Sequence, residues 1–214
     1  MANSFIAPIL SYEDICKTAD EFLRQHNQGD SLPVDIERIV EFDLGLDIFP
    51  LPHLQSTYDV DGFISGDLKV IYVDEFIYNQ RYARYRLTLA HEVGHYVLHS
   101  DLIMSVHPRS ISEWAKFIEE VDQEAYDWLE YQAFTFARAV LVPREDLQRH
   151  FLKEKERLKG KIDFVRSKGL PADSIQEYVV NAIATSLISA YDVSADVLTR
   201  RITKEMEKGH LVLE

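Results

Sequence analysis

Apolar and polar residues alternate with the period of an α-helix over much of the chain. The first such segment, residues 11–26, carries its apolar residues on one stripe, which predicts an amphipathic helix packed against a core. That stripe consists of Ile15, Ala19, Phe22 and Leu23. A polar loop at residues 27–33 interrupts the pattern, and residues 34–42 predict a second, shorter helix. The chain is therefore expected to begin with helices.

A short β-rich region follows these helices. Residues 46–49 have the composition of a strand. Residues 60–65 and 68–73 flank the turn dipeptide Gly66-Asp67, which predicts a β-hairpin. From residue 80 to residue 99 the apolar period is helical again.

The second half of the chain contains helical patterns only. They are expected at residues 111–120, 124–140 and 144–159, with two further helices between residues 174 and 208 that residues 191–194 separate. Helices, a small sheet and then helices alone predict an α+β fold. We expect it to divide into a domain at residues 1–160 and a C-terminal helical segment at residues 161–214.

Composition and charge narrow the class of protein. The chain has 214 residues, 46% hydrophobic and 28% charged, as in ordinary globular proteins. Its formal net charge of −13 argues against nucleic acid or an anionic membrane as main partner, since both require clustered Lys and Arg. The N-terminus lacks the pattern of a secretion signal, and no apolar segment approaches the roughly 20 residues that cross a bilayer. We therefore expect a cytoplasmic protein, with Cys16 as a buried, reduced thiol.

Residues 87–99, Leu-Thr-Leu-Ala-His-Glu-Val-Gly-His-Tyr-Val-Leu-His, carry the strongest chemical signal. His91 and His95 are four residues apart on a predicted helix, so both imidazoles can face one cation. Glu92 can reach a water bound to that cation and act as a general base. Two imidazoles and a carboxylate on a buried helix would be costly without partners. The pattern predicts the metal site of a zincin.

A catalytic zinc site has three protein ligands and one open position. His99 cannot be the third, because positions i and i+8 of a helix lie about 12 Å apart along its axis; we expect it to have a structural or supporting role. The third ligand should be a carboxylate from a second helix, and the candidates are Glu119, Glu120, Asp122, Glu124, Asp127 and Glu130. Glu130 begins a stripe of small residues, Ala133 and Ala137, that would let two helices approach closely. Glu130 is therefore preferred, with Asp127 in reserve.

Two segments carry a family resemblance. Residues 85–99 are Tyr-Arg-Leu-Thr-Leu-Ala-His-Glu-Val-Gly-His-Tyr-Val-Leu-His, and residues 130–143 are Glu-Tyr-Gln-Ala-Phe-Thr-Phe-Ala-Arg-Ala-Val-Leu-Val-Pro. They resemble the ImmA/IrrE family of metallo-endopeptidases, and the resemblance extends over about residues 12–205. The chain departs from the family's pattern at Leu87, where Phe is usual, at Phe134, where Asn is usual, and in a longer segment before Glu130.

The resemblance implies a zincin-like metallopeptidase core with an active-site helix, followed by a helical, helix-turn-helix-like segment. It implies His91, His95 and Glu130 as metal ligands and Glu92 as the catalytic base. The cofactor expected is Zn²⁺, with Mn²⁺ as the alternative. A peptide deformylase shares the five-residue motif but needs an upstream cysteine in a sequence block that this chain lacks.

The implied activity is metal-dependent cleavage of a specific cytosolic protein, above all a helix-turn-helix transcriptional repressor. Two alternatives stay open: a non-catalytic, metal-containing binding module, and a toxin or accessory protein that regulates a repressor by association. The last predicted helix mixes Arg200, Arg201 and Lys204 with acidic residues, which favours a packing or protein-docking role over DNA binding. The sequence leaves the oligomeric state open.

Peptide hydrolysis at such a site requires a water, a base and a donor to the oxyanion. Glu92 is expected to take the proton from the attacking water and give it to the leaving amine. The candidate oxyanion donors, among which the sequence does not choose, are Tyr96, His99, His107 and His150. The strand at residues 68–73 is a candidate for pairing with an extended substrate.

Overall fold

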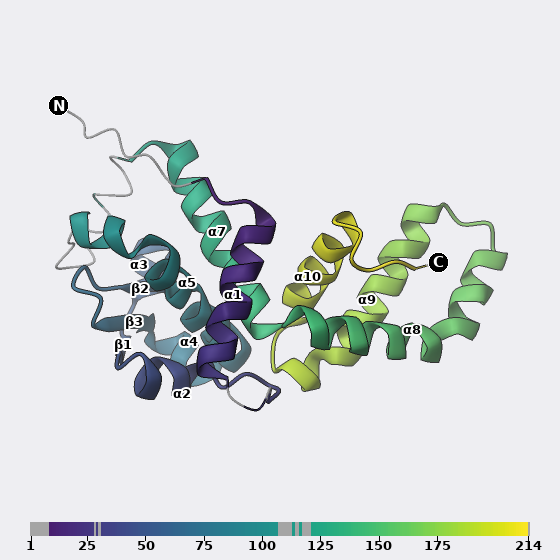
Figure 1. Cartoon of the computed structure of the whole chain (residues 1–214), viewed down its shortest axis with the longest axis horizontal. Coiled ribbons are helices and arrows are strands. Elements are labelled where there is room, and N and C mark those ends of the chain that lie inside the picture. The colour runs from purple at the N-terminus through teal and green to yellow at the C-terminus, as the bar shows by residue number, and fades with distance from the viewer. Residues whose placement is uncertain are drawn as a thin grey trace. The chain divides into compact units, whose positions relative to one another are not determined.

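The computed structural model describes residues 9–27, 29, 31–106, 113, 116 and 121–213. The chain forms two compact units, residues 1–140 and 141–214 (Figure 1). The first unit ends before the boundary expected at residue 160, because α8 (Arg144–Ser167) packs on α9 (Ala172–Tyr191) in the second unit. The segment predicted as a short helix at residues 111–120 falls largely outside the described residues.

Helix α1 (Tyr12–His26) is the amphipathic helix expected at residues 11–26. It begins with a capping box, in which the Ser11 hydroxyl accepts the Asp14 N–H at 3.2 Å and the Asp14 carboxylate accepts the Ser11 N–H at 3.2 Å. All four residues of the predicted apolar stripe are buried, and so is Cys16. Phe22 packs edge-on against Phe136, with ring centroids 5.6 Å apart.

A short helical segment and three strands follow α1. The predicted helix at residues 34–42 is present as α2 (Ile36–Arg38) continued by the π-helical turn η1 (Ile39–Asp43). The strands are β1 (Asp47–Leu51), β2 (Gly62–Ile64) and β3 (Val70–Asp74), and they lie in the order β1-β3-β2. The predicted hairpin is confirmed as the antiparallel pair of β2 and β3, whereas β1 runs parallel to β3.

The strand order corrects one expectation. Strand β3 is hydrogen-bonded on both sides, so residues 68–73 have no edge to offer an extended substrate, and that prediction was wrong. The edge strand of the hairpin is β2. Hydrogen bonds from Asp74 N–H to Asp61 O and from Ser65 N–H to Val70 O direct the odd-numbered residues of β2 toward β3. The peptide groups of Gly62 and Ile64 therefore face the outer edge.

Two short helices that the sequence did not predict flank the sheet, α3 (Leu54–Tyr58) and α4 (Glu75–Gln80). Both are held by the buried carboxylate of Asp74 at the end of β3. It accepts the N–H groups of Gln55 at 3.0 Å, Phe76 at 3.0 Å and Ile77 at 3.2 Å. One side chain therefore caps α4 and ties α3 to the sheet.

Helix α5 (Tyr82–Val106) carries the histidine motif and packs against β2 and β3. The Tyr85 hydroxyl donates to the Glu37 carboxylate at 2.9 Å, and the Arg86 guanidinium donates to Val34 O at 2.8 Å, so α5 is anchored to the α2 segment. The helix is kinked at His99, whose backbone is not helical (φ −131°, ψ 16°).

Helix α7 (Gln123–Leu141) corresponds to the helix predicted at residues 124–140, and it touches α5 at Gly94. A Cβ added to Gly94 would lie 2.9 Å from Ala133 O and 3.0 Å from Ala133 Cα. Strand β2 also comes close to α5, because a Cβ on Gly62 would lie 2.6 Å from Thr88 Cγ2. The two glycines allow β2 and α7 to approach α5 closely at points within two helical turns of each other.

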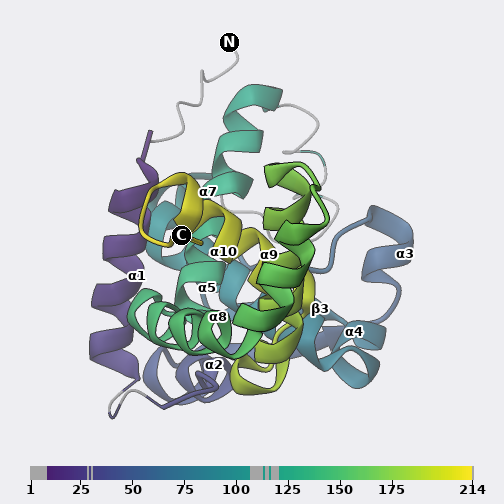
Figure 2. The same cartoon turned by 90° about the vertical axis from the view of Figure 1, so that its right-hand side faces the viewer.

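The second unit contains α8, α9 and α10 (Ala195–Glu207), with α9 packed between the other two (Figure 2). The two C-terminal helices predicted from the sequence are confirmed. The Glu205 carboxylate, fully buried, is paired with Arg201 at 2.5 Å, Arg144 at 3.0 Å and His210 at 2.6 Å. This network joins the start of α8, helix α10 and the C-terminal segment. None of the helices in the described residues is both long and apolar enough to cross a membrane.

The contact between α5 and α7 can be tested with two Gly→Ala substitutions. Gly94→Ala should lower the free energy of unfolding by about 1–3 kcal/mol, because the added methyl group meets backbone atoms that cannot rotate away. Gly160→Ala is the matched control: this glycine lies exposed inside α8 with nothing within 4 Å of the added Cβ, so the substitution should raise stability by about 0.5–1 kcal/mol. Chemical denaturation of the full chain measures both, and a neutral Gly94→Ala would contradict the close packing.

Candidate metal centre

Three side chains from α5 and α7 converge in the first unit. The Nε2 atoms of His91 and His95 are 3.0 Å apart, as expected for residues one helical turn apart. The carboxylate of Glu130 on α7 lies against both, with Oε2 at 3.2 Å from His91 Nε2 and Oε1 at 3.3 Å from His95 Nε2. The structure thus brings together the three residues that the sequence suggested as ligands.

The spacing and chemistry of this cluster fit a tetrahedral cation. With metal–nitrogen distances of about 2.0–2.1 Å, donors around one zinc ion lie roughly 3.3 Å apart, which matches the observed separations. Two imidazole nitrogens facing each other at 3.0 Å repel unless a proton or a cation lies between them. Among the described residues, no other set of three His, Cys, Asp or Glu side chains converges in this way.

A buried hydrogen-bond chain fixes the orientation of His95. Its Nδ1 lies 3.0 Å from Nδ1 of His99, and Nε2 of His99 lies 3.0 Å from Oε1 of Gln132. Burial lowers the pKa of His99 to about 4, so its ring is neutral and carries one N–H. Because Gln132 Oε1 can only accept, that N–H is on Nε2, and His99 Nδ1 accepts the proton of His95 Nδ1. The lone pair of His95 Nε2 is thereby directed at the metal position.

His91 is held differently. Its ring packs against Phe134, with centroids 4.1 Å apart, and its Nδ1 is buried without a hydrogen-bond partner in the described part of the chain. Phe134 stands where the resemblance expected Asn, and it supplies an apolar wall. His91 is therefore positioned by packing, and His95 by hydrogen bonds.

The charges of the cluster depend on one another. Burial alone would lower the pKa of His91, but the Glu130 carboxylate outweighs it and the pKa is raised. Burial alone would raise the pKa of Glu130, but the two imidazoles outweigh it and the pKa is lowered. Without a cation, therefore, the carboxylate is ionised and His91 holds the compensating proton. A bound cation replaces that proton.

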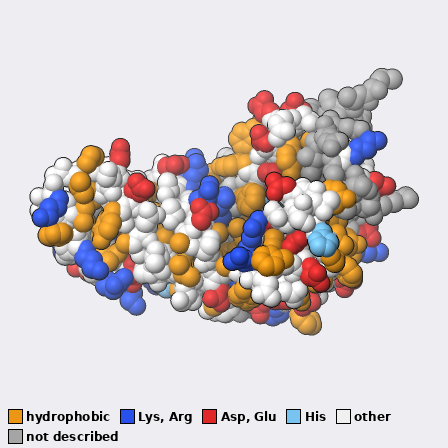
Figure 3. All heavy atoms as spheres, turned by 180° about the vertical axis from the view of Figure 1, so that it is seen from behind, with side chains coloured by type: hydrophobic (Ala, Val, Ile, Leu, Met, Phe, Trp, Pro, Cys, Tyr) orange, Lys and Arg blue, Asp and Glu red, His pale blue; other side chains and the backbone are white. Residues whose placement is uncertain are grey.

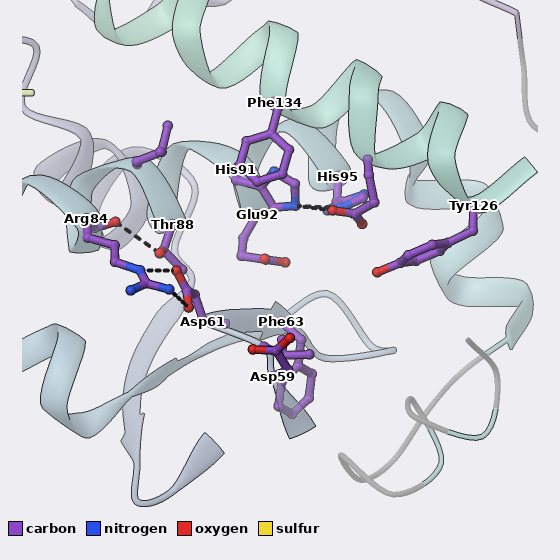
Figure 4. A pocket seen from close by; sticks show the side chains of 14 residues that line it. Asp59, Asp61, Phe63, Arg84, Thr88, His91, Glu92, His95, Tyr126 and Phe134 are labelled. Atoms are coloured by element: carbon purple, nitrogen blue, oxygen red, sulfur yellow. Dashed lines mark hydrogen bonds and ion pairs between the residues drawn. The ribbon is translucent and has the colours of Figure 1, made fainter. Parts of the chain in front are cut away.

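Glu92, the predicted base, is buried beside the cluster, and Figure 4 shows its carboxylate pointing into the pocket. Burial raises its pKa, and the nearby imidazoles of His91 and His95, with a smaller contribution from the Ile64 backbone, partly offset this. The outer edge of β2 therefore runs directly alongside the carboxylate. A carboxyl group whose pKa is raised by burial is suited to accept and return a proton.

These groups open into a cavity of about 320 Å³. Its walls come from α5, α7 and the segment leading into β2. Arg84 and Asp61 form a bidentate ion pair at one side, with N–O distances of 2.5 and 2.7 Å, and the Thr88 hydroxyl donates to Arg84 O at 3.0 Å (Figure 4). Phe63 and Tyr126 also line the cavity.

The structure distinguishes among the alternative ligands. Asp127, the reserve, is exposed and accepts a hydrogen bond from the Gln123 amide at 2.7 Å. Asp122 and Glu124 are exposed as well, and Glu119 and Glu120 lie outside the described residues.

None of the four candidate oxyanion donors is placed in the cavity. Tyr96 and His99 do not line it, and His107 lies outside the described residues. His150 belongs to the second unit, where its Nδ1 lies 2.9 Å from the Tyr191 hydroxyl. Sequence reasoning missed Tyr126 and Gln132, although both lie within one turn of Glu130 on α7.

The hydrogen-bond chain to His95 gives a first prediction for the centre. Gln132→Ala should weaken zinc binding about 10–100-fold, because His99 and then His95 lose their fixed tautomers. Competition with a chromogenic chelator measures the affinity, and Gln176→Ala on the exposed face of α9 is the control that should change nothing. Equal affinity of the Gln132 variant and the wild type would refute the orienting role.

The coupled charges give a second prediction. Since the pKa of His91 is raised above its ordinary 6.5, zinc must displace a proton at and somewhat above that pH, and its apparent affinity should fall about tenfold per pH unit as pH drops through the raised pKa. Glu130→Gln removes the charge that holds the proton, so affinity should be lower overall and its fall should shift to lower pH. Zinc titrations on both sides of pH 6.5 test this, and a pH-independent affinity would contradict it.

Comparison with known families agrees with this geometry. The model of the Peptidase_M78 family, described as an IrrE N-terminal-like domain, matches residues 43–160, more than half of the chain and the whole of the metal centre. No curated protein matches the chain significantly. The family supports a metallopeptidase-type function, and the His91, His95 and Glu130 cluster fits a metal ion. The chain belongs to the IrrE N-terminal-like family of peptidases.

Proposed function

We propose that the protein is a zinc-dependent endopeptidase that cleaves a specific cytoplasmic protein, a helix-turn-helix transcriptional repressor. The observation that carries the enzymatic part is the convergence of His91, His95 and Glu130 beside the buried carboxylate of Glu92, at the wall of a cavity. A purely structural zinc site has four protein ligands and no use for a neighbouring base. Three donors and a base favour catalysis over a binding module.

The roles of the side chains follow from their positions. His91, His95 and Glu130 would hold the cation, which when bound supplies a Lewis acid and lowers the pKa of water near it toward about 7. Glu92 would take a proton from the attacking water and deliver it to the nitrogen of the leaving amine. The apolar ring of Phe134 against His91 helps to exclude bulk water from that side.

The outer edge of β2 supports an extended peptide as the bound form of the substrate. Because the peptide group of Gly62 faces away from β3 and Gly62 lines the cavity, a substrate strand could pair there and pass beside Glu92. Main-chain pairing of this kind gives affinity with little preference for sequence, so the choice of target must come from elsewhere in the two proteins.

A basic, DNA-binding target fits the charge of the chain. The net charge of −13 attracts a cationic partner and disfavours nucleic acid itself. On α10, Arg200 is paired with Asp196, Arg201 with Glu205 and Lys204 with Glu207. On the face seen in Figure 3, Lys and Arg side chains are interspersed with acidic and apolar ones. We therefore assign the C-terminal helices to packing or protein docking.

The proposal is tested with Glu92→Gln and a repressor encoded beside the protein's gene. The wild type with zinc should yield one pair of fragments by intact-mass spectrometry, and the variant should bind zinc equally but cleave about 10²–10⁴-fold more slowly, because it lacks the base. Glu124→Gln, exposed on α7, is the control that should retain full activity. Undiminished cleavage by the Glu92 variant would refute the base assignment, and no cleavage by the zinc-loaded wild type would refute the repressor as substrate.

A further inference from the structure

Resting on the proposed function, we propose that Tyr126 is a catalytic residue: its phenol O–H donates the hydrogen bond that stabilises the oxyanion formed from the scissile carbonyl. No role was expected for this side chain from the sequence. It lies on α7, one turn before Glu130, so both side chains leave the helix on the same face.

Its position meets the geometric requirement for an oxyanion donor. Tyr126 lines the same cavity as His91, Glu92 and His95, and Figure 4 shows its ring extending from α7 with the hydroxyl foremost, into the space that these side chains face. The hydroxyl lies near the Glu130 carboxylate. A carbonyl oxygen held for attack between the ligand cluster and Glu92 would lie beside that carboxylate. Tyr126 extends into the same space and is therefore placed to donate to it.

The chemistry of the phenol is also suitable. A phenol has an ordinary pKa of about 10, so the group stays protonated at neutral pH and acts as a donor rather than as a base or nucleophile. The neutral hydroxyl brings no charge of its own to the cavity. As negative charge develops on the carbonyl oxygen, that oxygen becomes a strong competing acceptor.

The other side-chain donors around the cavity are committed elsewhere. Within the described lining, donors are found only on Arg84, Thr88, His91, His95 and Tyr126. Arg84 is held by Asp61 through two bonds, and the Thr88 hydroxyl donates to a backbone carbonyl of its own helix. The two histidines are the proposed ligands. Tyr126 remains as the side chain able to donate to the reacting atoms.

The hydrolytic step balances without a proton from Tyr126. The water oxygen bonds to the carbonyl carbon while one water proton passes to Glu92, and the oxyanion so formed accepts the Tyr126 hydrogen bond. The C–N bond then breaks as Glu92 returns its proton to the amine nitrogen, and the carbonyl re-forms. The phenol proton stays on Tyr126 throughout, so the residue should affect the barrier and not the stoichiometry.

Tyr126→Phe tests the assignment, because it removes the hydroxyl and keeps the ring. With a quenched-fluorescence peptide library as substrate, we expect kcat to fall about 10²–10³-fold with KM nearly unchanged. Affinity for a phosphinic peptide built on the best-cleaved sequence, a tetrahedral analogue of the intermediate, should fall by a similar factor. Zinc affinity, measured by chelator competition without substrate, should change less than threefold.

Tyr131→Phe is the matched control, since Tyr131 lies on the same helix, is 37% exposed and does not line the cavity. It should leave all three quantities unchanged. Unaltered kcat and phosphinate affinity in Tyr126→Phe would overturn the proposal. A loss of zinc affinity that accounts for the loss of activity would also overturn it, by reducing Tyr126 to a support for Glu130. If the zinc-loaded wild type cleaves neither the peptide library nor the repressor, the endopeptidase assignment itself fails, and the role of Tyr126 fails with it.

Discussion

The short distance between α5 and α7 at Gly94 and Ala133 is the constraint on which the metal centre depends. A glutamate side chain is short, so Glu130 can reach two imidazoles on another helix only if the backbones nearly touch one turn away. At this point the hydrogen of Gly94 is all that separates α5 from the main chain of α7. Widening the gap would leave two buried histidines facing each other without a counter-charge, which is costly in a low-dielectric interior.

Helix α7 does more than contribute one ligand. Gln132 fixes the tautomer of His99 and through it the lone pair of His95, and Phe134 packs on His91. Within little more than one turn, α7 thus supplies the negative charge of Glu130, the group that orients His95 and the apolar wall beside His91. The histidine motif on α5 is accordingly only half of the centre. The other half lies some 40 residues later on α7, and its residues do not form a motif that could be recognised from their spacing.

Local patterns in the sequence predicted the parts of the structure that local forces determine. The apolar stripe of α1, the hairpin, and the i, i+4 histidines depend on residues close in sequence, and the small-residue stripe after Glu130 correctly indicated a close helix contact. The second neighbour of β3 could not be predicted, because the parallel pairing with β1 joins segments separated by a short helix and by strand β2. Tyr126 and Gln132 were missed because their relevance appears only once the rotation of α7 about its axis is known.

Strand β2 is only three residues long, which limits the length of substrate main chain that could pair with it. A substrate bound in this way must offer a segment of main chain that is not hydrogen-bonded within its own helices, since backbone groups already paired in a helix cannot pair with β2. Compact helical domains expose such stretches only at linkers or through brief local opening. For the proposed repressor substrate, the rate of cleavage would therefore depend on how often its fold opens locally, and bound DNA that stabilises the fold would protect it.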